Sequence, residues 1–206
     1  QRQMCIRDSQ SRDLFVLVFN SLQVMSEKNP QQIIMGVDPG TNILGYSIIC
    51  ADKNTIKILI NGVIQLKKTD DHFIRLGIIY EKLTAYIIEY KPTALAIEAP
   101  FFGKNVQSML KLGRAQGAAI IAGVNNNIPV IEYSPRRIKQ SITGKGNASK
   151  EQVAKMLEST LKIIEMPKYF DATDALAVAV CHFNSGKKIA LKGKQFNGWA
   201  DYITAN

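Results

Sequence analysis

The chain has 206 residues, 46% of them hydrophobic, which is enough apolar material for one full α/β domain. Lysine and arginine exceed aspartate and glutamate by 26 to 17. The net charge of +9 favours a polyanionic partner, although soluble enzymes without such a partner also carry charges of this size. The odd count and the spacing of the cysteines, Cys5, Cys50 and Cys181, indicate neither a disulfide framework nor a zinc site and favour a reducing cytosol. No apolar run approaches the ~20 residues that span a bilayer.

The first 24 residues look foreign to the rest of the chain. Their only apolar run, 14–19, is shorter than the ~7–15 residues of a signal-peptide core. Residues 1–9 resemble translated sequencing-adapter read-through, and Met25 is a candidate start. We therefore predict a non-native or disordered leader at 1–24, a folded domain at 25–185 and a basic flexible tail at 186–206.

Three segments of β-forming residues follow one another closely, at 33–38, 45–50 and 56–65. Pro39-Gly40, residues 52–54 and Asn61-Gly62 are turn or bulge signals between or within them, so we predict an antiparallel meander. The first segment ends in Asp38. A charge at the end of a buried strand is unfavourable unless it is paired or holds a cation, so Asp38 is the first candidate site residue.

An amphipathic helix is predicted next, because apolar residues recur every three or four positions from Phe73 to Tyr90. Asp70 or Asp71 would cap this helix, and Pro92 would end it. Residues 94–98 then form a short apolar strand that, like the first, ends in a carboxylate, Glu98.

A second long helix is predicted over 106–124. Its expected buried face comprises Val106, Met109, Leu110, Gly113, Gly117, Ile120, Ile121 and Val124. Gly113 and Gly117 each lower helix propensity by about 1 kcal/mol relative to Ala, which indicates that something packs closely against that face. Close contact with the sheet and the seam of a dimer are both compatible with this pattern.

The remaining elements are a fifth strand at 129–133 and three helices. Ser134-Pro135 is a cap followed by a first-turn proline, and Ser149 with Gln152 forms a capping box. The last helix is apolar all round from residue 175 onward, and Asp171 and Asp174 lie one turn apart at its amino-terminal end. The helix dipole favours negative charge there, so an ordinary cap would explain one of them but hardly both.

Asp38, Glu98, Asp171 and Asp174 match in number and kind the demands of a two-metal site. Mg²⁺ prefers oxygen ligands, and about four carboxylates hold two cations ~3.5–4 Å apart astride a phosphodiester. Such a site activates water for in-line attack on phosphorus and leaves a 5′-phosphate and a 3′-hydroxyl.

Candidate DNA contacts gather in residues 134–150, which contain Arg136, Arg137, Lys139, Lys145 and Lys150 with Gly144 and Gly146 between them. A solvated charged loop is the alternative interpretation. The lysines of residues 186–194 indicate either a mobile arm for non-specific DNA contact or merely a disordered end.

Several ordered motifs resemble the RuvC family of bacterial Holliday-junction resolvases, within the ribonuclease H-like superfamily. The resemblance covers about 150 residues and rests on Gly36-Val37-Asp38-Pro39-Gly40-Thr41, Ala96-Ile97-Glu98, Gly103-Lys104-Asn105, Leu110-Lys111-Leu112-Gly113 and Asp171-Ala172-Thr173-Asp174-Ala175-Leu176-Ala177. It implies an α/β, ribonuclease H-like fold with a five-stranded mixed sheet, in which three antiparallel strands precede parallel additions, flanked by helices.

The resemblance also implies an activity. The family acts in DNA recombination and repair in the cytoplasm, as a homodimeric, Mg²⁺-dependent endodeoxyribonuclease that nicks opposed strands of a four-way junction with the RuvA and RuvB branch-migration proteins. We expect two Mg²⁺ per active site, with Mn²⁺ as a substitute.

The resemblance assigns roles to individual residues. Asp38, Glu98, Asp171 and Asp174 align with the four catalytic metal ligands, and Lys139 and Lys150 align with basic residues close to the scissile phosphate. The base-stacking wedge aligns with Phe101 or Phe102, of which Phe101 is nearer by its spacing from Glu98. The further DNA contacts that we expect are Lys104, Lys111, Arg114, Arg136, Arg137 and Lys145.

Three other functions are compatible with parts of the sequence. A ribonuclease H-like nuclease with another nucleic-acid substrate would use the same carboxylates. The Gly-Val-Asp-Pro-Gly-Thr turn also resembles the phosphate-binding turn of actin-like ATPases, but these need a second such domain. A junction-binding protein without cleavage would be expected to lack one of the ligands.

Overall fold

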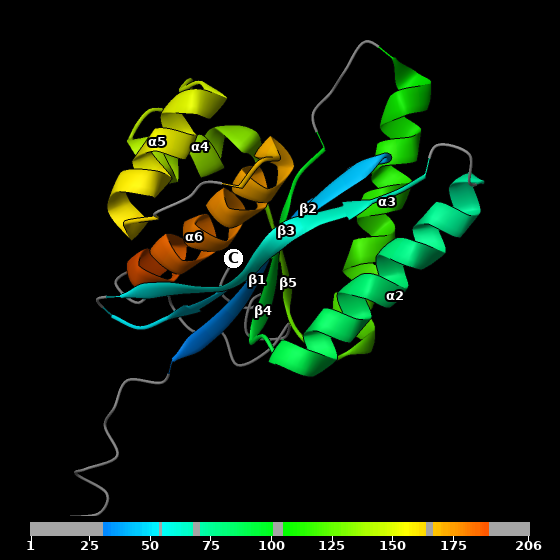
Figure 1. The fold of residues 1–206 in the computed structure, drawn as a ribbon, viewed down its shortest axis with the longest axis horizontal. Coiled ribbons are helices and arrows are strands. Elements are labelled where there is room, and N and C mark those ends of the chain that lie inside the picture. Colours follow the sequence, from blue (N-terminus) through cyan, green and yellow to red (C-terminus); the bar gives the residue numbers. More distant parts are fainter. Residues whose placement is uncertain (1–30, 54, 68–70, 101–104, 164–166, 190–206) are drawn as a thin grey trace, which may run out of the picture. The chain divides into compact units, whose positions relative to one another are not determined.

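The structure, a computed structural model, describes residues 31–53, 55–67, 71–100, 105–163 and 167–189. Within these ranges a five-stranded sheet has the order β3-β2-β1-β4-β5 (Figure 1). Its strands are β1 (Gln32–Asp38), β2 (Ile43–Ala51), β3 (Ile56–Gln65), β4 (Ala94–Glu98) and β5 (Val130–Tyr133). The helices are α2 (His72–Tyr90), α3 (Val106–Asn125), α4 (Pro135–Thr143), α5 (Lys150–Leu161) and α6 (Phe170–Ile189).

The sheet has the predicted mixed topology. β1, β2 and β3 pair in antiparallel fashion, and β4 and β5 are added parallel to β1 and to each other. Asn61-Gly62 neither turns nor bulges the chain, because both residues pair with β2 and the register shift lies just before them, opposite Ile48 and Ile49. Gly62 instead leaves room for Tyr46, whose hydroxyl lies 2.9 Å from where a Cβ would be.

Helices cover both faces of the sheet. Figure 1 shows α2 and α3 on one face and α4, α5 and α6 on the other. One apolar core joins the sheet to α2 and α3 through residues such as Ile79, Leu83 and Ala119, and the other joins it to α4–α6 through residues such as Ile138 and Leu176. No described helix is long and apolar enough to span a membrane.

Local capping fixes where the helices begin. The Asp71 carboxylate accepts a 2.7 Å hydrogen bond from the backbone N–H of Phe73 and so caps α2. Ser134 caps α4 ahead of Pro135, and Ser149 and Gln152 form the predicted capping box of α5. Cys50 and Cys181 are free thiols.

Two strand glycines allow α6 to lie directly on the sheet. A Cβ on Gly36 would lie 2.2 Å from the Ala175 carbonyl oxygen, and one on Gly45 would lie 1.9 Å from the Asp171 carbonyl oxygen. The helix therefore packs backbone against strand, and its first turn is held beside the carboxyl end of β1. It continues to Ile189, beyond the domain boundary predicted at residue 185.

The buried face predicted for α3 is wrong. Ala115, Gln116, Ala119, Ala122 and Gly123 are the buried residues of this helix. Val106, Leu110, Ile121 and Val124, from the predicted face, are 49–66% exposed. Among the described residues, no atom outside the helix's own backbone lies within 4 Å of a Cβ added to Gly113 or Gly117, so these glycines are not needed for contact with the sheet. Close approach of α3 to β4 and β5 requires small side chains, and this requirement outweighs hydrophobicity.

Candidate active site at the carboxyl ends of the central strands

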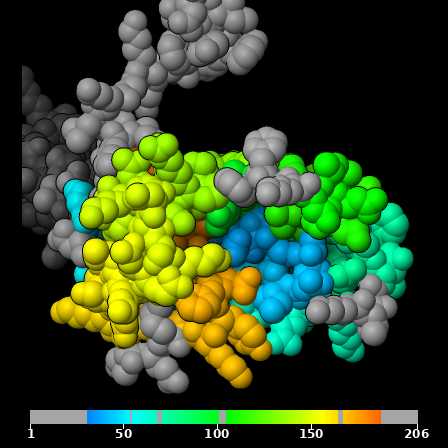
Figure 2. All heavy atoms as spheres, turned by 90° about the horizontal axis from the view of Figure 1, so that it is seen from above, coloured from blue at the N-terminus to red at the C-terminus, as the bar shows by residue number. Residues whose placement is uncertain are grey.

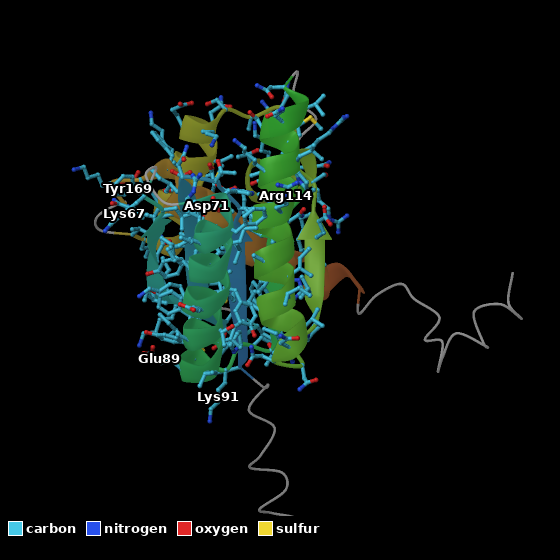
Figure 3. The ribbon with its side chains drawn as sticks, turned by 90° about the vertical axis from the view of Figure 1, so that its right-hand side faces the viewer. Lys67, Asp71, Glu89, Lys91, Arg114 and Tyr169 are labelled. Atoms are coloured by element: carbon cyan, nitrogen blue, oxygen red, sulfur yellow. The ribbon has the colours of Figure 1, made fainter. Side chains whose placement is uncertain are left out.

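The predicted carboxylates come from separate elements that meet at one end of the sheet. Asp38 is the last residue of β1 and Glu98 the last of β4, and these strands are parallel neighbours. Asp71 at the start of α2 and Tyr169 beside the start of α6 lie at this end, with Glu89 and Lys91 at the other (Figure 3). In Figure 2 the blue of the β1 region is visible here between the yellow-green and yellow of α4 and α5, the orange of α6 and the green of α3.

Three of the four carboxylates line one pocket of about 80 Å³. Asp38, Glu98 and Asp174 contribute its acidic wall, and Lys139 and Lys150 its basic wall; the other lining residues are Pro135, Ile138, Val153 and Ala177. Asp171 is outside this lining, although its charge acts on Asp38. The structure therefore brings together Asp38, Glu98 and Asp174, and places Asp171 one helical turn away.

The electrostatics of this pocket disfavour charge on the strand carboxylates. Burial raises the pKa of Asp38 to about 8, with contributions from the negative charges of Glu98 and Asp174. Burial likewise raises the pKa of Glu98 to about 7, with Asp174 adding to the shift and Lys150 and Lys139 opposing it. Neighbouring carboxylates that are hard to ionise together form a site that a cation would stabilise.

Lys150 supplies a positive charge within this cluster. Lys150 is the first residue of α5, and its ammonium forms an ion pair with Asp174 on α6. Burial opposes the charged form, but the hydrogen bond and the attraction of Asp174, with Asp38 and Glu98 beyond it, raise the pKa of Lys150 overall. The sequence did not predict this pairing.

The carboxylates of the pocket have the right chemistry to bind a divalent cation, but their side chains are not arranged around a common point. Carboxylate oxygens are the ligands that hard cations prefer, and their mutual repulsion here would be relieved by binding. Within the ranges described, however, no group of three or more His, Cys, Asp or Glu side chains is arranged to hold a metal ion. Binding therefore requires the carboxylates to turn toward one another.

Two residues that the sequence analysis missed hold the backbone around the strand carboxylates. Arg75 on α2 donates from one guanidinium nitrogen to the Thr41 carbonyl at 3.0 Å and to the Asn42 side-chain oxygen at 3.2 Å, which fixes the turn after Asp38. Gln116 on α3 is buried and donates to the Glu98 carbonyl at 3.4 Å. The sequence signal that could have identified Gln116 is that it is a polar residue among the alanines on the inner face of α3.

The predicted DNA contacts fall into three groups. Lys139 and Lys150 line the carboxylate pocket, and Arg136 lies beside it in the lining of a second hollow with Lys139. Lys145 is exposed on the loop after α4, and Lys111 and Arg114 are exposed on α3. Phe101, Phe102 and Lys104 lie outside the described residues, as does the tail beyond Ile189.

Arg137 turns away from the pocket and ties α4 to α6. Its guanidinium donates to the Ser185 hydroxyl at 3.2 Å and lies 5.7 Å from the centre of the Tyr133 ring. The Tyr133 hydroxyl and His182 Nδ1 are hydrogen-bonded at 2.9 Å. Burial lowers the pKa of His182, which lies outside the lining of the carboxylate pocket.

An antiparallel three-strand meander extended by parallel strands, with carboxylates ending β1 and β4 and opening α6, defines a ribonuclease H-like nuclease. The family model described as crossover junction endodeoxyribonuclease RuvC matches residues 34–182. The chain belongs to this family, whose nuclease chemistry implies use of a divalent metal.

Comparisons with individual proteins agree with this assignment. The RuvC of Cytophaga hutchinsonii is 53% identical over 182 residues, 88% of this chain and 89% of that protein, and the RuvC of Porphyromonas gingivalis is 53% identical over 85% of this chain and 95% of that protein. The solved structure of Thermus thermophilus RuvC in complex with Holliday junction substrate has 29% identity and a TM-score of 0.72, and covers 76% of this chain and 96% of that chain. A yeast mitochondrial Holliday junction resolvase shares the fold at 15% identity and a TM-score of 0.56.

Proposed function

We propose that this chain resolves four-way DNA junctions in recombination and repair by nicking two opposed strands symmetrically. The observation that carries the proposal is the pocket in which Asp38, Glu98 and Asp174 from three elements face Lys139 and Lys150. Carboxylates to hold cations and ammonium groups to receive a phosphodiester are the parts that phosphodiester hydrolysis needs. The similarity to Thermus thermophilus RuvC, solved with a Holliday junction, supports the substrate.

Asp38, Glu98, Asp171 and Asp174 are proposed to hold two Mg²⁺, or Mn²⁺ in their place. When bound, the ions lower the pKa of water for attack on phosphorus and stabilise the leaving 3′ oxygen. Lys139 and Lys150 neutralise the phosphate that enters the pocket. Lys150 also balances Asp174 before DNA arrives, because the two already form an ion pair.

DNA contact beyond the pocket is proposed for Lys104, Lys111, Arg114, Arg136 and Lys145, and base stacking for Phe101 or Phe102. Base–aromatic stacking contributes ~1–3 kcal/mol per base. If Phe101 holds the strands open at the crossover, Phe101→Ala will slow cleavage of a fully paired junction far more than of one with mismatches there. Equal loss on both substrates with a lower melting temperature would identify Phe101 as a packing residue.

A homodimer is proposed because symmetric nicking needs two active sites related by a two-fold axis. The outer side of α3 supports this proposal. Val106, Leu110, Ile121 and Val124 form an exposed apolar stripe, and Gly113 and Gly117, open to solvent between them, would admit another helix at close range. Partnership with RuvA and RuvB, and a place in the cytoplasm, are proposed from family resemblance.

The test is incubation of the purified chain with a synthetic four-way junction and a matched linear duplex, with Mg²⁺ and with EDTA. We expect paired symmetric nicks on the junction only, and only with Mg²⁺. Nicking of both DNAs at similar rates would favour a nuclease with another substrate. ATP hydrolysis without nicking would favour an actin-like ATPase.

A further inference from the structure

A second hollow adjoins the carboxylate pocket, and its lining contains Arg136, one of the residues proposed above to contact DNA. It is open, has a volume of about 620 Å³, and is lined by Pro135, Arg136, Lys139, Gly146 and Asn147. Pro135 and Lys139 line both spaces, so the hollow begins where the carboxylate pocket ends. A chain that enters one space can therefore continue into the other.

The lining of the hollow is cationic, and its Arg136 forms no ion pair within the described residues. Residues 133–150 contain no Asp or Glu. Within the described part of the chain, neither Arg136 nor Lys139 takes part in a salt bridge. Both lie in the first turn and a half of α4, where the helix dipole itself favours anions over cations. Lys139 also faces the Glu98 carboxylate, but an unpaired Arg136 at such a position is explained by a ligand that carries negative charge.

Arg136 is held in place rather than left free in solvent. A Cβ on Gly146 would lie 2.7 Å from Arg136 Cγ and 3.2 Å from its Nε, so the stem of the arginine rests directly on the glycine backbone. The loop that carries Gly146 is itself fixed at both ends. Gly144, in the left-handed conformation, donates to the Gln140 carbonyl, and Ala148 is buried in the core.

We propose that this hollow is a subsite for the phosphate next to the scissile one, bound by Arg136 with Lys139 at the boundary between the two phosphates. The proposal rests on the proposed function, because it places the scissile phosphate in the carboxylate pocket. Arg136 and Lys139 are three residues apart, so they lie on neighbouring turns of one face of α4. One strand can therefore contact both residues with successive phosphates.

The test is a double-mutant cycle between protein variants and modified junctions. In each modified junction, one phosphate within two nucleotides of the cleavage position is replaced by a neutral methylphosphonate. The half-saturating concentration in single-turnover nicking is measured for each pair. We expect Arg136→Ala and the critical methylphosphonate each to raise it about tenfold, the effect of losing one charge-assisted contact, and the two together to raise it no further.

Gly146→Ala separates a built subsite from simple attraction, because it keeps every charge but displaces the Arg136 stem. It is expected to raise the half-saturating concentration several-fold, and only on junctions that retain the critical phosphate. Lys155→Ala, an equal loss of charge on α5 outside both pockets, is the control and should change it less than twofold.

Additive effects of Arg136→Ala and every methylphosphonate, or an unchanged Gly146→Ala protein, would overturn the subsite. Failure of the unaltered chain to nick the unmodified junction would instead overturn the proposed function.

Discussion

The glycines on the α6 face of the sheet lie in strands and are covered by a helix, whereas those on the outer side of α3 lie in a helix and are covered by nothing described. Gly36 and Gly45 touch the α6 backbone, and Gly113 and Gly117 have no neighbour within 4 Å. The first pair closes the fold and brings Asp174 to Asp38. The second pair contributes no contact within the described chain, so its proposed purpose lies in association with a second chain.

The largest effect is expected for Asp174, the carboxylate that the packing of α6 on the strand glycines places beside Asp38. Asp174→Asn keeps the shape of the side chain and removes its charge, so cleavage should fall about a thousandfold or more, equivalent to about 4 kcal/mol in the barrier. Junction binding, measured by fluorescence anisotropy, should be kept or tightened, because repulsion of phosphates is reduced. Parallel losses of binding and cleavage would contradict a role in holding metal.

The next prediction contrasts the two kinds of glycine in one measurement. Gly36→Ala should destabilise the fold by about 3 kcal/mol or more, because its methyl group would overlap the Ala175 carbonyl and the Ala179 N–H. Gly113→Ala should leave stability unchanged or raise it by up to about 1 kcal/mol through helix propensity. Urea unfolding of both variants measures this, and similar losses in the two would break the comparison.

The outer face of α3 is tested by a bulky residue in its glycine gap. Gly117→Leu should leave each chain folded and weaken dimerisation about tenfold or more, as measured by sedimentation equilibrium. Gly77→Leu is the matched control, because Gly77 is also an open helical glycine but lies on α2. If the two variants dissociate alike, or if the unaltered chain is monomeric and nicks at full rate, α3 is not the seam.

The last prediction is a pH dependence of stability without metal. The folded-state pKa values of Asp38 and Glu98, about 8 and about 7, exceed the ordinary values of 3.8 and 4.5. Between these limits the folded chain binds more protons than the unfolded chain, so stability falls as pH rises from about 4 to about 8. In EDTA the melting temperature should fall steadily from pH 5 to pH 8. Added Mg²⁺ should restore more of it at pH 8, where the carboxylates are ionised.

Asp38→Asn is the control for this pH dependence, since it removes the group with the larger shift. The slope of melting temperature against pH should become shallower in this variant. An unchanged slope would assign the dependence to groups outside the pocket.

Local sequence signals predicted most of the helices and strands and the end of the sheet at which the candidate site lies. The strand ends at Asp38 and Glu98, the Ser149–Gln152 capping box and the paired aspartates of α6 depend on residues close together in sequence, and their elements were predicted correctly. The parallel pairing of β1 with β4 then places the two strand carboxylates at one edge.

The errors arise where packing between distant segments decides. On α3 the larger apolar residues predicted an inward face, but the close approach of the sheet selects Ala115, Ala119 and Ala122 instead. The ion pair of Lys150 with Asp174 joins residues 24 apart, and it depends on how α5 and α6 cross rather than on any local pattern. Arg75 and Gln116 act on the backbone of other elements, which no periodicity reports.

The tie between α4 and α6 determines when the site is assembled. Because Arg137 and Tyr133 bond to Ser185 and His182, the helix that carries Lys139 and the helix that carries Asp174 are joined before any DNA is present. The conformational entropy of placing these two helices against each other is therefore lost during folding rather than during binding. What binding still has to arrange are the side chains of the pocket, because its carboxylates are not yet turned toward a common cation.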